Sequence, residues 1–390
     1  MKMTKPVVIS RRSPIYRDSA FVFENIEQSE QAFNAEHRYP QSGEQLFYTR
    51  YGNPNVIETE QEITRLEGSD WALLTASGMA AIDVALSLFH ERENTGTWLF
   101  FEEIYGGTKD YIKEVLQARR GIQCEYFTTS PRKEKFDLMD LKYALDHLKP
   151  KLLYFEPVSN PLLIVANGNE IIRLAKERGI KVVVDNTFAT PILWKPLEQG
   201  ADLVLHSATK YLAGHGNITA GVVCGHSDEL HKAALTYRKF VGHILSPDDA
   251  YRLGTQLQTF ELRVTRQCQN ALKLANLLQA HKQVKNVRYP GLVTHATHQE
   301  ALNIFGKRGF GAMVTFELKG GQPAVETFIA NAAPHVKYVT SLGDPQSTLI
   351  HVPTIFSAER FPFPGMIRFS VGFEAYSLLE KSVTTALEAL

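Results

Sequence analysis

Lys210 is the residue of this chain whose sequence surroundings point most directly to chemistry. It follows two hydroxyl side chains, Ser207 and Thr209, just after the apolar run 203–205. A lone lysine is usually a solvated surface residue. A lysine that is desolvated at the end of a buried strand, near other cations, has a depressed pKa and is nucleophilic. We therefore consider Lys210 a candidate reactive amine.

Asp185 and Asn160 follow two other apolar runs. Asp185 comes directly after the three valines 182–184, where a carboxylate is expensive to bury unless it meets a cation. It could cap the segment that follows, or it could pair with a protonated ring nitrogen. Asn160, in the turn segment 156–161, is either a turn former or a hydrogen-bond donor to a phenolic oxygen.

Two further turns contain glycine. Gly78 and Met79 stand where a small-residue turn leads into a helix, and such a start offers free backbone N–H groups to a phosphate. An isolated turn of this kind is more often a plain strand-to-helix connection. Tyr105 stands beside Gly106 and Gly107, which let the backbone approach a flat ligand that stacks on the ring. Alone, Tyr105 would be a half-buried packing residue.

These residues are ambiguous one by one, but together they match a single ligand. A helix start with hydroxyl groups binds a phosphate, an aromatic side chain stacks on a flat ring, an aspartate holds a pyridinium nitrogen, and a lysine forms an imine with an aldehyde. Pyridoxal 5′-phosphate (PLP) has all four features. The pattern therefore predicts PLP as the cofactor. The sequence contains no Walker loop and no dinucleotide-binding fingerprint.

Alternating strands and helices are expected to position these residues. Continuous apolar strands that alternate with helices predict an α/β domain with a mostly parallel sheet, covered on both faces. Ligands of such sheets bind beyond the carboxyl ends of the strands, which is where the candidate residues stand. The expected strands lie at 71–74, 98–101, 124–127, 152–155, 182–184, 203–205 and 222–224.

Three segments make up the predicted domain organisation. Residues 1–57 lack periodicity and form an N-terminal arm that packs on its own chain or on a partner subunit. Residues 58–245 form the α/β domain. Residues 246–390 form a smaller α+β domain that begins with a long helical stretch from Asp248 to about His281 and contains later strands at 313–317 and 366–371.

Composition limits the class of protein. Forty-two basic residues balance forty-two acidic ones, so no global field favours nucleic acid or an anionic membrane. Three widely spaced cysteines fit a reducing compartment, and we expect a cytoplasmic location. The start of the chain lacks the apolar core of a signal peptide, and no apolar run is long enough to span a membrane. His295 and His298 are expected to be structural rather than metal ligands.

Seven segments together resemble the Cys/Met-metabolism PLP-dependent enzymes, a family that includes cystathionine γ-synthase, cystathionine β- and γ-lyases and methionine γ-lyase. The resemblance covers residues 13–388, and its most specific parts are VVVDNTFATP and SATKYLAGHGN. The matching segments are 48–55, 74–82, 105–108, 156–161, 182–191, 207–217 and 368–374.

The resemblance implies a fold type I PLP-dependent transferase and a role for each candidate residue. Lys210 would bond to the cofactor and move protons at Cα, Asp185 would face the ring nitrogen, Tyr105 would stack on the ring and act as an acid or base, and Asn160 would contact the phenolic oxygen and lie by the substrate. The phosphate would be bound by Gly78, Met79, Ser207 and Thr209, and in a neighbouring subunit by Tyr48 and Arg50; the substrate carboxylate would be bound by Arg368, with Ser341 nearby.

The implied activity is that of a carbon–sulfur lyase or γ-replacement enzyme acting on a sulfur amino acid, in a dimer or tetramer. An aminotransferase or another fold type I PLP enzyme is the first alternative, and a non-catalytic PLP-binding relative is the second. Segments that select the substrate disagree: YGGT is typical of synthases and cystathionine γ-lyases, whereas Ser341-Leu342-Gly343-Asp344 is closer to methionine γ-lyase relatives. Without the resemblance, Arg368 would be assigned to a polar strand face. Arg263 and Arg266, on the long helical stretch, are expected to be solvent-exposed or inter-subunit charges.

Overall fold

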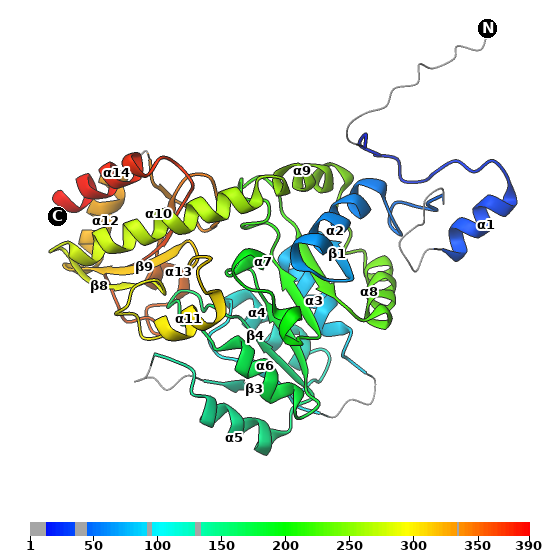
Figure 1. Cartoon of the computed structure of the whole chain (residues 1–390), viewed down its shortest axis with the longest axis horizontal. Coiled ribbons are helices and arrows are strands. Elements are labelled where there is room, and N and C mark those ends of the chain that lie inside the picture. The colour runs from blue at the N-terminus through cyan, green and yellow to red at the C-terminus, as the bar shows by residue number, and fades with distance from the viewer. Residues whose placement is uncertain (1–12, 36–44, 92–95, 129–133, 334) are drawn as a thin grey trace, which may run out of the picture.

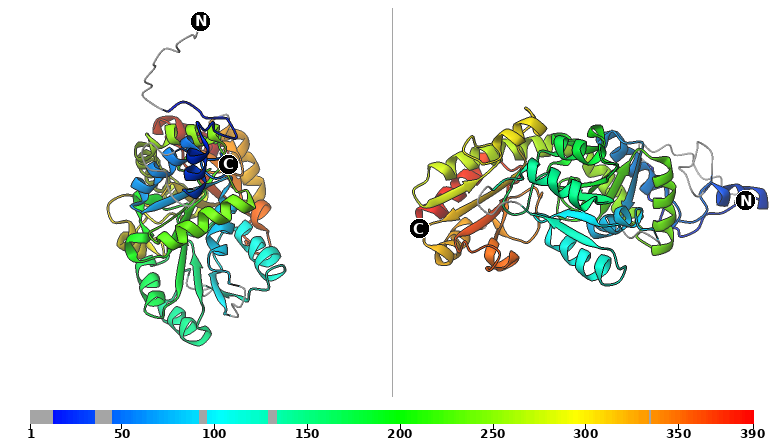
Figure 2. Two further views of the ribbon diagram at one scale, coloured as in Figure 1. Left: turned by 90° about the vertical axis from the view of Figure 1, so that its right-hand side faces the viewer. Right: turned by 90° about the horizontal axis from the view of Figure 1, so that it is seen from below.

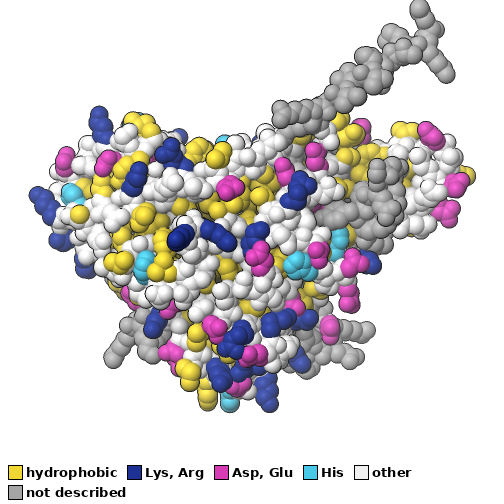
Figure 3. All heavy atoms as spheres, in the orientation of Figure 1, with side chains coloured by type: hydrophobic (Ala, Val, Ile, Leu, Met, Phe, Trp, Pro, Cys, Tyr) yellow, Lys and Arg dark blue, Asp and Glu magenta, His cyan; other side chains and the backbone are white. Residues whose placement is uncertain are grey.

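The computed structural model describes residues 13–35, 45–91, 96–128, 134–333 and 335–390. The segment 1–12, on which the expectation about a signal peptide rests, lies outside these residues. Within them, no helix combines the length and the apolar character that a membrane span requires. Acidic and basic side chains are interspersed on the face shown in Figure 3, in keeping with the balanced composition.

A seven-stranded sheet forms the centre of the larger part of the molecule (Figure 1). Its strand order is β1-β7-β6-β5-β4-β2-β3; β7 runs antiparallel to both neighbours and the other pairs are parallel. The predicted mostly parallel sheet is thus confirmed. Its strands are β1 (Trp71–Thr75), β2 (Trp98–Phe101), β3 (Cys124–Phe127), β4 (Leu152–Phe155), β5 (Lys181–Asp185), β6 (Leu203–His206) and β7 (Gly221–Gly225).

Helices cover this sheet, and each interior strand is buried on both faces because apolar side chains point in both directions. Local signals set several helix ends: Asn53 caps the helix that starts at Pro54, and Gly68, with a φ of 73°, ends it. The covering elements are α2 (Pro54–Glu67), α3 (Gly78–Ser87), α4 (Gly106–Tyr111), the π-helix η1 (Ile112–Gln117), α5 (Leu138–Leu148), α6 (Gly168–Lys176), α7 (Thr190–Leu193), η2 (Pro196–Gln199), α8 (Asp228–Val241) and α9 (Pro247–Leu257).

A second, five-stranded sheet lies at the C-terminal end of the molecule (Figure 1), with the order β10-β11-β12-β9-β8. The long helix α10 joins the two parts, because its first half packs on the first core and its second half on the second. The elements of this part are α10 (Phe260–Ala280), β8 (Val284–Arg288), α11 (His298–Phe305), β9 (Met313–Leu318), α12 (Gly321–Ala332), β10 (Lys337–Tyr338), β11 (Thr348–His351), α13 (Val352–Phe356), β12 (Met366–Ser370) and α14 (Tyr376–Glu388).

Two expectations about local structure were wrong. The N-terminal arm is not irregular throughout, because it contains α1 (Ile26–Asn34), capped by the Asn25 side chain and projecting from the body (Figures 1 and 2). The helical stretch from Asp248 to His281 consists of two helices, because Gln258 and Thr259 are not helical and separate α9 from α10. No glycine or proline marks that break. The domain division at residue 245 stays a prediction.

Candidate active site

A cavity of about 230 Å³ lies at the carboxyl ends of the parallel strands and against the second sheet. It contains most of the residues predicted from the sequence, and it adds several that were not predicted. Its lining residues are Ser77, Gly78, Met79, Tyr105, Glu156, Val158, Asn160, Asp185, Thr187, Phe188, Ser207, Thr209, Lys210, Thr219, Thr340, Leu342 and Arg368.

The start of α3 forms one end of the cavity. Ser77 caps this helix, with its Oγ accepting the Ala80 N–H at 3.1 Å, and the amides of Gly78 and Met79 lie in the first turn, where helix geometry gives an N–H no partner within the helix. Any Cβ at Gly78 would stand 2.8 Å from the Ser207 Cβ, so only glycine lets the helix start approach Ser207 this closely. This end suits an anion.

Asp185 is buried on the wall of the cavity. One of its carboxylate oxygens accepts the Thr187 N–H at 3.0 Å and the Thr187 hydroxyl at 2.5 Å, and the other accepts the Tyr154 hydroxyl at 3.3 Å. Burial raises the pKa of Asp185, opposed by the bonds from Thr187. Among the described residues no lysine or arginine is bonded to it, so the carboxylate can accept a further cationic donor from within the cavity.

Lys210 lies between the two parts of the molecule. Its Nζ donates to the Ser341 Oγ at 3.2 Å. Burial, and after it the charge of Arg368, lowers the pKa of Lys210, whereas Asp344 raises it. The loop that carries Ser341 is pressed against the lysine backbone: a Cβ on Gly343, whose φ is 84°, would stand 2.9 Å from the Lys210 carbonyl carbon.

Arg368 projects into the cavity from β12 of the second sheet. It is only 5% exposed; its Nη1 donates to the Asn160 Oδ1 at 3.0 Å and its Nη2 to the Ser341 carbonyl oxygen at 3.3 Å. Burial lowers its pKa to about 10, and its Nε has no hydrogen-bond partner in the described part of the chain. The reading of Arg368 as part of a polar strand face is therefore wrong, and a buried cation that retains donor capacity suits a carboxylate ligand.

Comparison with known proteins also indicates a PLP-dependent enzyme. The model of the family described as "Cys/Met metabolism PLP-dependent enzyme" matches residues 2–388. The chain belongs to this family. Family membership makes the protein a PLP-dependent enzyme and PLP its cofactor.

Individual relatives match over nearly the whole chain. Cystathionine beta-lyase of Lactococcus lactis subsp. cremoris (strain MG1363) is 37% identical over 350 residues, 87% of this chain and 88% of that protein. L-methionine gamma-lyase of Pseudomonas putida is 35% identical over 388 residues, 96% of this chain and 92% of that protein. A crystal structure of cystathionine gamma synthase from Xanthomonas oryzae pv. oryzae in complex with cystathionine has a TM-score of 0.83 and 32% identity, covering 96% of this chain and 92% of that one.

The residues of this PLP-dependent enzyme fit the cofactor on structural grounds. The glycine-dependent start of α3 suits the phosphate, the buried Asp185 suits the ring nitrogen, and Lys210 is a desolvated amine in the same cavity. Thr209 shares its hydroxyl with the backbone of Ala220, donating to the carbonyl oxygen at 3.1 Å. In the described part of the chain the Asn160 side chain is bonded through its Oδ1, which accepts from the Arg368 Nη1, and the predicted contact with a phenolic oxygen would use its Nδ2. These individual roles remain predictions.

Tyr105 lines the cavity and is 47% exposed. Its backbone N–H donates to the Glu156 Oε1 at 2.6 Å. Gly107 leaves space for the Tyr105 ring, because a Cβ there would stand 2.5 Å from the Tyr105 Cε1.

Glu156 was missed as a site residue, although it directly follows β4 at the same sheet edge as Asp185. Burial, and after it the Asp185 charge, raises the pKa of Glu156 well above its usual range.

Tyr48 and Arg50 do not line the cavity of their own chain. The Arg50 Nη1 donates to the Lys239 carbonyl oxygen at 2.8 Å, and its guanidinium lies 4.9 Å from the centroid of the Tyr51 ring. Their contribution to a neighbouring subunit stays a prediction.

The expectation that Arg263 is solvent-exposed was wrong, because the residue is only 4% exposed. It donates to the carbonyl oxygens of Tyr211 and Leu212 at 2.9 and 3.0 Å and so braces the segment that follows Lys210. In the described residues no group of three or more metal-ligating side chains occurs. The His298 Nδ1–H donates to the Pro290 carbonyl oxygen at 2.7 Å.

Proposed function

We propose that this enzyme cleaves a carbon–sulfur bond of a sulfur amino acid and releases a thiol, a 2-oxo acid and ammonia. One observation carries the proposal: a single cavity brings a desolvated amine (Lys210) together with a buried guanidinium (Arg368) that retains donor capacity. The relatives named for cystathionine and methionine cleavage support a sulfur amino acid as the substrate class.

The chain's own residues account for the steps around the reacting carbon. Arg368 binds the substrate carboxylate through a two-pronged ion pair, which fixes Cα relative to Lys210. Burial lowers the pKa of the Lys210 amine and so favours its neutral form. In that form the amine takes the proton from Cα and can return it at the neighbouring carbons. Asp185 would accept a hydrogen bond from the protonated ring nitrogen and hold that proton in place. When bound, PLP supplies an electron sink for the negative charge at Cα.

The assembly and location follow the same proposal. We infer a homo-oligomer, either a dimer or a tetramer, because Tyr48 and Arg50 lie outside their own cavity and match a family motif for the neighbouring phosphate site. Three free, buried thiols (Cys124, Cys224 and Cys268) support a reducing compartment such as the cytoplasm.

A substrate panel tests the proposed function. The holoenzyme is incubated with cystathionine, methionine, cysteine and an O-acylhomoserine, and thiol, 2-oxo acid and ammonia are measured. From cystathionine, β-cleavage gives homocysteine and pyruvate, whereas γ-cleavage gives cysteine and 2-oxobutyrate. Amino-group transfer to an added keto acid, with no thiol released, would indicate an aminotransferase instead. A wild-type protein that binds PLP but converts no amino acid would indicate a non-catalytic relative.

A further inference from the structure

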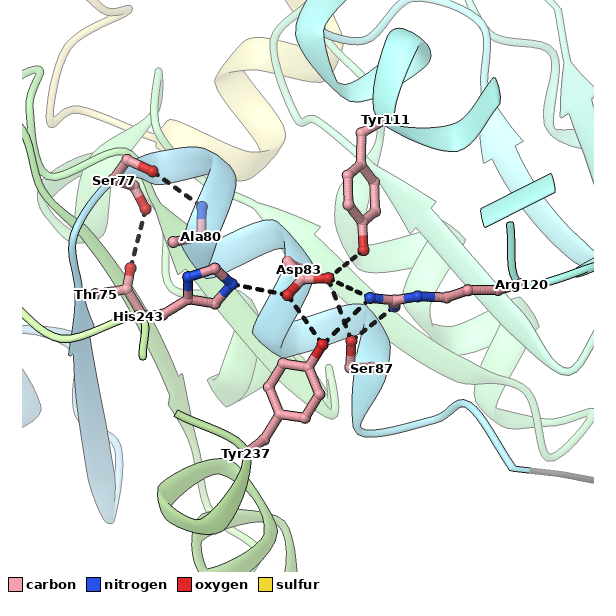
Figure 4. A network of polar contacts seen from close by, with 9 residues as sticks. All are labelled: Thr75, Ser77, Ala80, Asp83, Ser87, Tyr111, Arg120, Tyr237 and His243. Atoms are coloured by element: carbon pink, nitrogen blue, oxygen red, sulfur yellow. Dashed lines mark hydrogen bonds and ion pairs between the residues drawn. The ribbon is translucent and has the colours of Figure 1, made fainter. Parts of the chain in front are cut away.

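Asp83 is the centre of a polar network outside the cavity (Figure 4). Its Oδ1 accepts the Tyr111 hydroxyl at 2.5 Å and the Arg120 Nη2 at 2.6 Å. Its Oδ2 accepts the Tyr237 hydroxyl at 3.0 Å and the His243 Nε2 at 2.9 Å. Four donors from outside α3 thus converge on one carboxylate, which is 9% exposed. The Ser87 hydroxyl, on α3 itself, donates to Oδ1 at 3.4 Å.

The four donors come from separate parts of the fold and approach Asp83 from different sides (Figure 4). Tyr111 ends α4, Arg120 follows the π-helix η1, Tyr237 lies on α8, and His243 follows that helix. Arg120 also donates to the Tyr237 hydroxyl at 3.2 Å, which links two of the donors to each other. The network therefore ties α3, on which Asp83 lies, to three neighbouring segments at one point.

The carboxylate is ionised in this environment. Burial raises the pKa of Asp83, but the hydrogen bonds from Tyr111, His243 and Arg120 outweigh it and hold the pKa below the usual value. Hydrogen bonds to an ionised acceptor are roughly twice as strong as neutral ones, and they are directional. These bonds offset the cost of burying a charge.

Ser87, at the end of α3, also bonds a neighbouring segment, because its Oγ accepts the Arg120 Nη1 at 2.8 Å. The rest of the helix packs mainly through apolar contacts. Its sequence, GMAAIDVALS, contains no other charged residue, and all positions from Ala80 to Leu86 are buried. Apolar packing holds such a helix against its neighbours but specifies its rotation and axial position weakly. Asp83 lies five residues after Gly78, which at 1.5 Å per residue is about 7.5 Å along the helix axis, so a shift at Asp83 is transmitted directly to the first turn.

We propose that Asp83 is a positioning residue for the cofactor: its hydrogen bonds with the four donors outside α3 fix this helix so that the amides of Gly78 and Met79 face the PLP phosphate. The inference rests on the proposed function, since it assigns the phosphate to this helix start. It adds a residue that touches neither cofactor nor substrate but determines how tightly the cofactor is held.

Asp83→Asn tests the proposal in the full-length holoenzyme. The change preserves shape but replaces one acceptor oxygen with a donor, so two donors of the network lose their partner. PLP dissociation on dilution is followed by visible absorbance, and the phosphate environment by the ³¹P chemical shift of the bound cofactor. We expect the PLP dissociation constant to rise about tenfold and the ³¹P signal to shift, with kcat at saturating PLP within twofold of wild type.

Asp146→Asn is the matched control, because it removes another aspartate–arginine pair (Asp146 Oδ1 to Arg178 Nε, 2.7 Å) on exposed α5, away from the cavity. It should change neither readout. Tyr237→Phe removes only one donor to Asp83 and replaces Asp83→Asn in the test if that variant does not fold. We expect its PLP dissociation constant to rise two- to threefold.

The outcomes separate the inference from the proposed function. A dissociation constant and a ³¹P shift that match wild type, even with a lowered Tm, would overturn the inference by leaving Asp83 a purely structural role. A tenfold fall in kcat with unchanged PLP binding would overturn it as well. Failure of the wild-type chain to bind PLP would refute the proposed function itself.

Discussion

Replacing Arg368 with glutamine should remove the main anchor of the substrate carboxylate while leaving the cofactor in place. The structure gives the reason: Arg368 comes from β12 of the second sheet, whereas the phosphate and ring-nitrogen positions come from the first. The glutamine side chain is two bonds shorter than that of arginine, carries no charge and lacks the two-pronged geometry.

The size of the effect follows from the bonds lost. A hydrogen bond to a charged group contributes about 1.5–3 kcal/mol, so the loss of two weakens carboxylate binding in the transition state by about 3–6 kcal/mol. Each 1.4 kcal/mol is about tenfold in rate. We expect kcat/KM to fall by about 10²–10⁴.

Steady-state kinetics on the best substrate of the panel, together with the visible absorbance of bound PLP, measure both parts of the prediction. Arg263→Gln is the control: Arg263 is equally buried and burial also lowers its pKa to about 10, but its bonds go to backbone carbonyl groups. It should lower the Tm and reduce kcat/KM by less than tenfold. If Arg368→Gln lowered kcat/KM no more than Arg263→Gln did, the assignment of the carboxylate site would be wrong.

Three further predictions concern the cofactor and the fold. Gly78→Ala places a Cβ 2.8 Å from the Ser207 Cβ, so the PLP dissociation constant should rise at least tenfold; an unchanged value in an equilibrium titration would contradict the close approach. Asp344→Asn removes the charge that raises the pKa of Lys210, so the pH midpoint of PLP uptake by the apoenzyme should move down; a midpoint that moves up would refute the sign. Burial lowers the pKa of His231 from 6.5 to about 4. Below pH 6.5 the unfolded chain therefore binds more protons, and stability falls by up to about 3 kcal/mol as the pH drops towards 4; denaturant unfolding of His231→Phe should show a smaller fall, and parallel pH curves would exclude this cause.

The sheet and most of the cavity could be predicted from sequence because each rests on a local pattern. The valines before Asp185 and the apolar run before Lys210 require buried strands, and parallel strands bring their carboxyl ends to one edge. Arg368 needed the family resemblance, because alternation within a strand cannot distinguish a solvent-facing from a cavity-facing cation.

Other features depend on contacts that no local pattern encodes. Arg263 is buried because the carbonyl oxygens of Tyr211 and Leu212, some fifty residues away in the chain, meet its guanidinium. Glu156 had the same signal as Asp185, a carboxylate directly after an apolar run, and was overlooked. Asp83 also had a visible signal, since it is a charge in an otherwise apolar helix, but its donors could be identified only from the tertiary structure.

The packing of the Gly343 loop on the Lys210 backbone has an evolutionary consequence. In the proposed site, one sheet and its helix start would hold the cofactor, while the loop at 341–344 and β12 of the other sheet would face the substrate. Mutations in that loop or strand can change which amino acid is accepted and leave the cofactor site intact. Descendants of such a chain can therefore diverge in substrate preference without having to evolve cofactor binding anew.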